Sequence, residues 1–222
     1  MDEGEKRGYG AVLFDLDGTL VDTYRLILGS MRHATRACLG REIPEGELMS
    51  LVGTPLDDQM VFFAGGDAEL GAELARVYRE HNERTHDREI RRFPGVEDML
   101  AQLRRAGLPV AVVTSKKHAL AMRGIRRCGL EGLVDFVIGP DDFPAHKPDP
   151  GPVLEGCRRA GVEPSACLFV GDSPFDIQAG NAAGCATVAV SWGVFTAERL
   201  AEDGPTYTVG SPAEICSIAI GC

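Results

Sequence analysis

The segment that most constrains this chain is the run Phe14–Asp22, Phe-Asp-Leu-Asp-Gly-Thr-Leu-Val-Asp. It places two carboxylates, Asp15 and Asp17, where the apolar stretch Ala11–Leu16 gives way to a turn. Side chains two residues apart share a face of a strand, and the glycine that follows them tolerates backbone conformations that other residues resist. The run therefore predicts a strand that ends in a turn carrying a nucleophilic carboxylate and a neighbouring acid, as phosphoryl transfer to an aspartate requires.

Composition excludes several classes of function. The 222 residues are 44% hydrophobic and 25% charged, which is enough for one large core domain with a smaller insert. The net charge of −10 counts against a nucleic-acid or anionic-membrane surface, because both need clustered lysines and arginines. Residues 1–7 are charged and lack the apolar segment of a signal peptide. We expect a cytoplasmic protein, a monomer or weak homodimer, with neither a nucleic-acid nor a membrane partner.

The seven cysteines are scattered along the chain. No two of them form a C-x-x-C pair, so the spacing predicts neither a zinc site nor a disulfide framework. We expect reduced thiols, several of them buried as small hydrophobic side chains.

The stretch after the first strand has helical periodicity and no convincing strand. Expected helices span Tyr24–Leu39, Pro44–Ser50, Leu56–Phe63, and Asp67 to about Thr85. This stretch, residues 22–91, is predicted to be an inserted cap domain, an α-helical bundle. Hinges are expected near residues 21–23 and 92–94, so that the bundle can close over a site on the core.

The rest of the chain alternates between short apolar strands and helices. Strands are expected at Val110–Thr114, Val134–Ile138, Cys167–Gly171 and Thr187–Val190. Helices are expected at Val96–Ala106, His118–Cys128, Pro152–Ala160 and Asp176–Ala183. Such alternation is typical of a central parallel sheet flanked by helices. The predicted fold is therefore α/β, with a discontinuous Rossmann-like core formed by residues 9–21 and 92–222.

Polar residues follow several of the expected strands, at the edge where open α/β sheets bind ligands. Gly18 and Thr19 follow the first strand, and Thr114 and Ser115 follow the next. Their hydroxyls and amides are candidates to hold phosphate oxygens, although Thr-Ser after a strand is also a common helix cap. Lys147 stands in a loop that two prolines stiffen, where an ammonium would neutralise phosphoryl charge. A solvated surface lysine is the alternative.

Two more carboxylates, Asp172 and Asp176, follow the expected strand Cys167–Gly171. Mg²⁺ prefers octahedral oxygen ligation by one or two carboxylates, waters and a substrate phosphate. Asp15 and Asp172, together with the main-chain carbonyl of Asp17, would meet that requirement. Asp176 begins a helix, so it is either a capping acid or a residue that orients the loop lysine or a metal-bound water.

In their order along the chain, these clusters resemble the four motifs of the haloacid dehalogenase-like hydrolase superfamily, over about Ala11 to Val194. Within the insert, Gly53-x-Pro55-Leu56 and residues 78–82, Tyr-Arg-Glu-His-Asn, look like the phosphoglycolate phosphatase and bacterial pyrophosphatase branch.

The resemblance implies roles for individual residues. Asp15 would be the nucleophile that becomes an aspartyl phosphate, and Asp17 would protonate the leaving oxygen and then activate water. Thr114 and Lys147 would hold the phosphoryl group. Asp15, Asp17 and Asp172 would bind Mg²⁺.

The expected function is that of a magnesium-dependent phosphatase acting on a small phosphorylated metabolite, similar to phosphoglycolate phosphatase. A pyrophosphatase, a phosphatase of a sugar phosphate or natural-product intermediate, and a β-phosphoglucomutase-like phosphomutase are the enzymatic alternatives. Ile27 stands where related mutases carry a histidine, which favours water as the acceptor. A phospho-accepting receiver module is the non-enzymatic alternative, but it needs no cap of about seventy residues. Gly53, Thr54 and Pro55 are the candidates for substrate contact from the cap.

Overall fold

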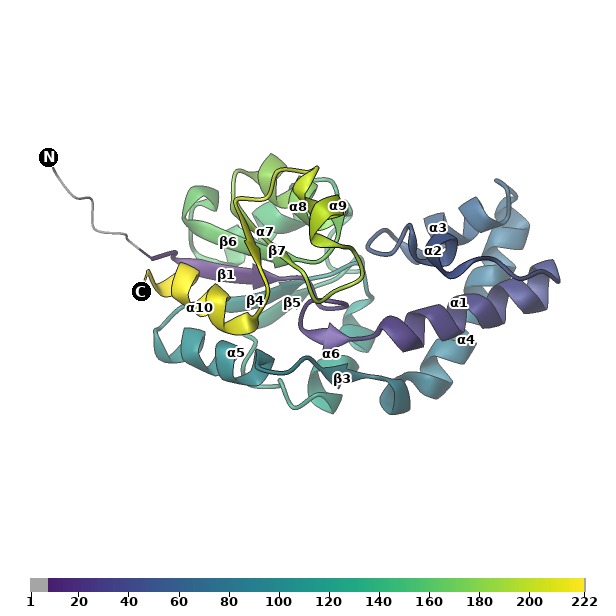
Figure 1. Cartoon of the computed structure of the whole chain (residues 1–222), viewed down its shortest axis with the longest axis horizontal. Helices are drawn as coiled ribbons and strands as arrows, with labels where there is room; N and C mark the ends of the chain where they lie inside the picture. Colours follow the sequence, from purple (N-terminus) through teal and green to yellow (C-terminus); the bar gives the residue numbers. More distant parts are fainter. Residues whose placement is uncertain (1–7, 222) are drawn as a thin grey trace, which may run out of the picture.

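A computed structural model describes residues 8–221 of the chain (Figure 1). Its main sheet has six parallel strands in the order β5-β4-β1-β6-β7-β8. The strands are β1 (Ala11–Phe14), β4 (Val110–Val113), β5 (Phe136–Ile138), β6 (Cys167–Gly171), β7 (Ala186–Val190) and β8 (Tyr207–Val209). β1 lies near the middle because all four of its residues are apolar and fully buried, so it can be covered on both faces. The predicted α/β fold with a central parallel sheet is confirmed.

Helices cover the two faces of this sheet. The helices of the core are α5 (Val96–Arg105), α6 (His118–Arg127), α7 (Gly151–Ala160), α8 (Pro174–Ala183), α9 (Ala197–Ala201) and α10 (Pro212–Ile220). Val12 and Phe14 of β1 pack in one hydrophobic cluster with α5, α6 and α10. Ala11 and Leu13, which point to the opposite face, pack in another cluster with α7 and α8. The alternation of side chains along β1 thus divides the core into two layers.

Four helices form a separate lobe at one end of the molecule (Figure 1). They are α1 (Tyr24–Leu39), α2 (Glu45–Met49), α3 (Leu56–Phe63) and α4 (Ala68–Glu89). This helical lobe has its own hydrophobic cluster, in which Met31, Leu48, Met60 and Leu74 are fully buried. The chain enters and leaves the lobe through β2 (Val21–Asp22) and β3 (Arg91–Arg92), which pair in an antiparallel ribbon.

The ends of the lobe helices follow local signals in most places. α1 ends before Gly40, which adopts the left-handed conformation (φ 63°), as expected for a residue beyond a helix end. Asp67 caps α4 by accepting hydrogen bonds from the backbone N–H groups of Glu69 and Leu70. α4 continues four residues beyond the predicted end at Thr85, because His86 in its last turn is buried against α6.

Several elements were not predicted. β2 and β3 have two residues each, and β8 exposes two of its three residues, so none has a strong apolar pattern. The short helix α9, the C-terminal helix α10 and a 3₁₀ turn at Pro164–Ala166 were also missed. Within residues 8–221, no helix combines the length and hydrophobicity needed to cross a membrane. The charged residues 1–7 and Cys222 lie outside the described part of the chain.

Candidate active site

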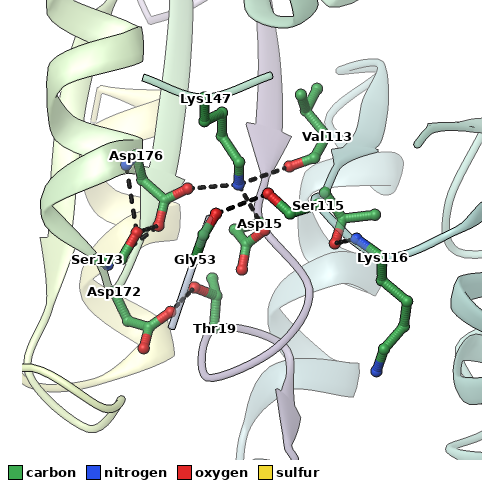
Figure 2. Close-up of polar contacts among 11 residues, drawn as sticks. Asp15, Thr19, Gly53, Val113, Ser115, Lys116, Lys147, Asp172, Ser173 and Asp176 are labelled. Carbon is green, nitrogen blue, oxygen red and sulfur yellow. Dashed lines mark hydrogen bonds and ion pairs between the residues drawn. The ribbon is translucent and has the colours of Figure 1, made fainter. Parts of the chain in front are cut away.

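The polar residues predicted from the sequence gather at the carboxyl edge of the sheet (Figure 2). Asp15 follows β1, Thr114 follows β4, and Asp172 follows β6. Lys147 comes from the loop before α7, and Asp176 lies in the first turn of α8. Because parallel strands all end at the same edge, segments far apart in the sequence meet there.

Lys147 lies at the centre of this cluster. Its Nζ donates to Asp15 Oδ1 at 2.7 Å, to Asp176 Oδ1 at 2.5 Å and to the Val113 carbonyl at 3.2 Å. All three ammonium protons have acceptors, and the residue is only 3% exposed. Burial opposes the charge, but the two carboxylates outweigh it and raise the pKa of Lys147. The alternative of a solvated surface lysine is wrong.

Asp176 makes the contacts of a helix-capping acid and also those of a residue that orients the loop lysine. Its Oδ2 accepts from the backbone N–H and the hydroxyl of Ser173, at 3.0 and 2.6 Å, in a capping box at the start of α8. Its Oδ1 accepts from Lys147. The helix cap therefore fixes one oxygen of the carboxylate and leaves the other to hold the lysine.

Asp172 is held by two donors from other parts of the core. Thr19 Oγ1 donates to its Oδ1 at 3.1 Å, and the Val194 N–H donates to its Oδ2 at 2.7 Å. Gly18 has φ +85°, and a Cβ there would overlap the Asp172 carboxylate, so only glycine fits. The Thr19 hydroxyl, which is predicted to bind phosphate, contacts the Asp172 carboxylate in this conformation.

Asp15, Asp172 and Asp176 form a buried group whose carboxylate oxygens lie within 4.8 Å of one another. Burial raises the pKa of Asp15 to about 7, despite the nearby Lys147. Burial, with the charges of Asp176 and Asp15, also raises the pKa of Asp172 well above its usual range. When all three acids are ionised, Lys147 balances one of three negative charges, so the group carries an excess of two. Clustered oxygen donors with this excess fit a divalent cation such as Mg²⁺.

The Asp17 carboxylate lies outside this group. It forms an ion pair with Lys116, whose Nζ lies 2.6 Å from Asp17 Oδ1, and both side chains are largely buried. Lys116 is a residue that the sequence analysis missed as a participant. The available signal was its position directly after Thr114 and Ser115 at the carboxyl end of β4.

The hydroxyls of Thr114 and Ser115 both have protein partners. Thr114 Oγ1 accepts from the Lys116 N–H at 3.2 Å, which is the helix-cap type of contact considered as the alternative. Ser115 Oγ donates to the Gly53 carbonyl at 2.7 Å and so joins the core to the helical lobe (Figure 2). The Ser115 proton is therefore donated within the protein, whereas Thr114 accepts in its contact and can still donate its hydroxyl proton to a phosphate oxygen.

Gly53 brings the helical lobe directly against the polar cluster. It has φ +109°, and a Cβ there would lie 2.8 Å from Ser173 Oγ and 2.9 Å from a ring carbon of Phe175. Thr54 Oγ1 donates to the Leu51 carbonyl at 2.8 Å, which stabilises the loop itself. Pro55 is the N-cap residue directly before α3. Of the three predicted cap contacts, Gly53 is the one that approaches the core site.

Comparison with known proteins identifies the family. The sequence model of the haloacid dehalogenase-like hydrolases matches residues 12–190. The chain belongs to this family. Hydrolases of this family generally use a divalent metal ion, in agreement with the group of buried carboxylates.

Curated relatives cover nearly the whole chain. A protein of Clostridium perfringens, provisionally named pyrophosphatase PpaX, is 41% identical over 94% of this chain and 96% of its own length. Pyrophosphatase PpaX of Bacillus velezensis is 33% identical over 94% of this chain and 95% of its own length. A crystal structure described as a predicted phosphoglycolate phosphatase from Haemophilus somnus is 26% identical, with a TM-score of 0.85, over 95% and 97% of the two chains. The family and these relatives identify the protein as a phosphatase.

Proposed function

We propose that this phosphatase is magnesium-dependent and hydrolyses a small phosphorylated metabolite through an aspartyl phosphate on Asp15. The observation that carries the proposal is the buried group of three carboxylates, whose negative charge exceeds that of Lys147 by two. Such a group is costly to bury unless a divalent cation completes it. Asp15, the main-chain carbonyl of Asp17, and Asp172 would hold Mg²⁺, which would screen the phosphoryl charge from the carboxylates.

The positions of Asp15 and Lys147, together with the family resemblance, support the following roles. Asp15 attacks phosphorus, and Lys147 at 2.7 Å balances the charge of the carboxylate and of the phosphoryl group. Asp17 gives a proton to the leaving oxygen and then takes one from the attacking water. The backbone amides of Thr19 and Ser115 and the hydroxyl proton of Thr114 hold phosphoryl oxygens, since the Thr19 and Ser115 hydroxyls donate to other partners.

The helical lobe, residues 22–91, acts as a cap on a core formed by residues 9–21 and 92–222. The β2–β3 ribbon is the connection about which it opens, near the predicted hinges. In the present conformation Gly53 touches the core site, so substrate enters after the lobe moves away. The loop Gly53–Pro55 then selects the group that leaves with the scissile oxygen.

Pyrophosphate and phosphoglycolate are the first substrates to test, because relatives over nearly the full chain carry these names. Transfer to a second sugar hydroxyl is disfavoured, because Ile27 is buried in the lobe cluster and offers no hydrogen-bonding group. A single phosphorylation without turnover, as in a receiver module, is disfavoured by the phosphatase relatives.

Phosphate release from a panel of compounds tests this proposal. The panel contains pyrophosphate, phosphoglycolate, glucose 1-phosphate and p-nitrophenyl phosphate, each with Mg²⁺, with Ca²⁺ and with excess chelator. We expect repeated turnover with Mg²⁺, poor turnover with Ca²⁺, which prefers longer and more numerous bonds, and none with chelator. Full activity in chelator would exclude the metal, and conversion of glucose 1-phosphate to its 6-phosphate without free phosphate would indicate a mutase.

A further inference from the structure

A second buried group of potential metal ligands lies near the end of the sheet at which the strands begin, opposite the active site. Cys157 is in α7, Cys167 is the first residue of β6, and Cys185 lies between α8 and β7. Their three sulfur atoms lie within 4.8 Å of one another, with Cys157 Sγ 3.6 Å from Cys185 Sγ. Asp172 follows the other end of β6, so the thiols and the active-site carboxylates are separated by the length of that strand.

The surroundings of this cysteine cluster are apolar. Its members belong to the hydrophobic cluster that packs α7 and α8 against the sheet, and they are 1%, 0% and 7% exposed in sequence order. Among residues 8–221, no carboxylate or imidazole joins the group. A site with sulfur donors alone favours a soft metal ion such as Cu(I) over Mg²⁺, Ca²⁺ or Mn²⁺.

The spacing of the sulfurs matches three-coordination of one ion. Three sulfurs at about 2.3 Å from an ion in their plane lie about 4.0 Å apart. The observed separations, 3.6 Å for one pair and at most 4.8 Å for the others, are compatible with this value. A closed structural zinc site takes four ligands, and the described residues supply three.

We propose that Cys157, Cys167 and Cys185 form a binding site for a soft monovalent metal ion, with Cu(I) as the biological ligand. The ion binds the sulfur atoms of Cys157, Cys167 and Cys185, and each thiol that becomes a ligand loses its proton to solvent. No residue is oxidised or reduced. Because the cluster is remote from Asp15, the ion stabilises the native state by binding to it and takes no part in phosphate hydrolysis.

Metal retention measured on the full-length chain tests this inference. The reference protein carries Cys38→Ser and Cys222→Ser, so that neither Cys38, which is only partly buried, nor the last residue of the chain binds the probe ion. It is incubated without oxygen with Cu(I), or with Ag(I) as a redox-inert probe, and then dialysed against a competing chelator. We expect one ion per chain, a thiolate-to-copper absorption in the ultraviolet, and a raised melting temperature. Cys157→Ala and Cys167→Ala should lose the ion but keep phosphatase activity, which shows that they fold.

Cys128→Ala is the matched control, because Cys128 is also buried but lies outside the cluster, at the end of α6. It should retain the ion as the reference protein does. Loss of the ion in this control to the same extent as in Cys157→Ala would overturn the proposal, as would a reference protein that retains none. A peroxide-induced disulfide between Cys157 and Cys185 in a protein that retains no ion would assign the cluster to redox chemistry instead.

Discussion

The two sides of the active site are held in place very differently. On the core side, Lys147 makes three polar contacts and Asp176 uses both of its oxygens. On the lobe side, the loop reaches the site through Gly53, with a single hydrogen bond from Ser115. The groups proposed for the reaction therefore belong to a rigid network, whereas the groups proposed for substrate choice belong to a loosely attached loop. Such an arrangement lets the loop change without disturbing the reacting groups.

The largest expected effect on the core side comes from Asp15→Asn. A neutral amide neither attacks phosphorus nor binds a divalent cation well, so turnover should fall by about a thousandfold or more. Steady-state phosphate release measures the loss, and circular dichroism checks that the fold remains. Activity well above about a thousandth of the wild type would count against Asp15 as the nucleophile.

Lys147→Met should damage both stability and activity. It removes the cation that pairs with both Asp15 and Asp176, and breaking a buried ion pair costs about 3–5 kcal/mol. Urea unfolding of the metal-free protein measures this change. Lys117→Met is the matched control, since Lys117 is exposed, and it should unfold like the wild type. Equal stability of the two variants would contradict the central position given to Lys147.

The metal-free protein should lose stability as pH rises from about 4 to about 7. The pKa of Asp15 is raised from 3.8 to about 7 in the folded state, so in this window the folded chain binds more protons than the unfolded chain. The free energy of unfolding therefore decreases with pH. Melting temperatures in chelator measure the slope, which Asp15→Asn should reduce and Mg²⁺ should suppress. A stability that rises with pH over this window would contradict the proposed excess of buried negative charge.

On the lobe side, Gly53→Ala should lower kcat/KM by about tenfold to a hundredfold, because the added methyl group pushes the loop from Ser173 and Phe175. Gly65→Ala is the control in the same lobe. Gly65 also has a positive φ, +70°, but a Cβ there meets no atom within 4 Å. Both variants therefore strain the backbone, but only in Gly53→Ala does the added methyl group meet the core. Equal activity of the two would show that the Gly53 contact is irrelevant to turnover.

Ser115→Ala should have the smallest effect. It removes the hydrogen bond to the Gly53 carbonyl, which is worth about 0.5–1.5 kcal/mol. We expect a change of a few fold in KM, little change in kcat and nearly normal thermal stability. A loss as large as that of Asp15→Asn would mean that the Ser115 side chain acts on the phosphoryl group directly.

Most of the fold could be predicted because its signals are local. The helices α1 and α3 and the strand β6 have the predicted bounds, since periodicity and apolar runs define them. β8 and α9 were missed because they are short or partly exposed and have no such pattern.

The location of the site could also be predicted, but not the partners of its side chains. Asp15 and Asp172 each directly follow a predicted strand, and Lys147 lies in the loop after another predicted strand. The three residues therefore meet at the same edge of the sheet. The Lys116–Asp17 pair joins residues 99 apart, and the Ser115–Gly53 hydrogen bond depends on how the lobe packs on the core. The cysteine cluster could not be predicted for the same reason, since its members come from α7, β6 and the turn before β7. No spacing in the sequence encodes these contacts.

Trapping of the phosphorylated enzyme tests the central proposal most directly. The protein is mixed with Mg²⁺ and a good substrate, quenched within a turnover and reduced with borohydride, which converts an aspartyl phosphate to homoserine. Mass spectrometry of the peptides should find homoserine at position 15, and it should be absent in chelator and in Asp15→Asn. Release of phosphate in the first turnover with Asp15 unmodified, or modification at another carboxylate, would contradict the account.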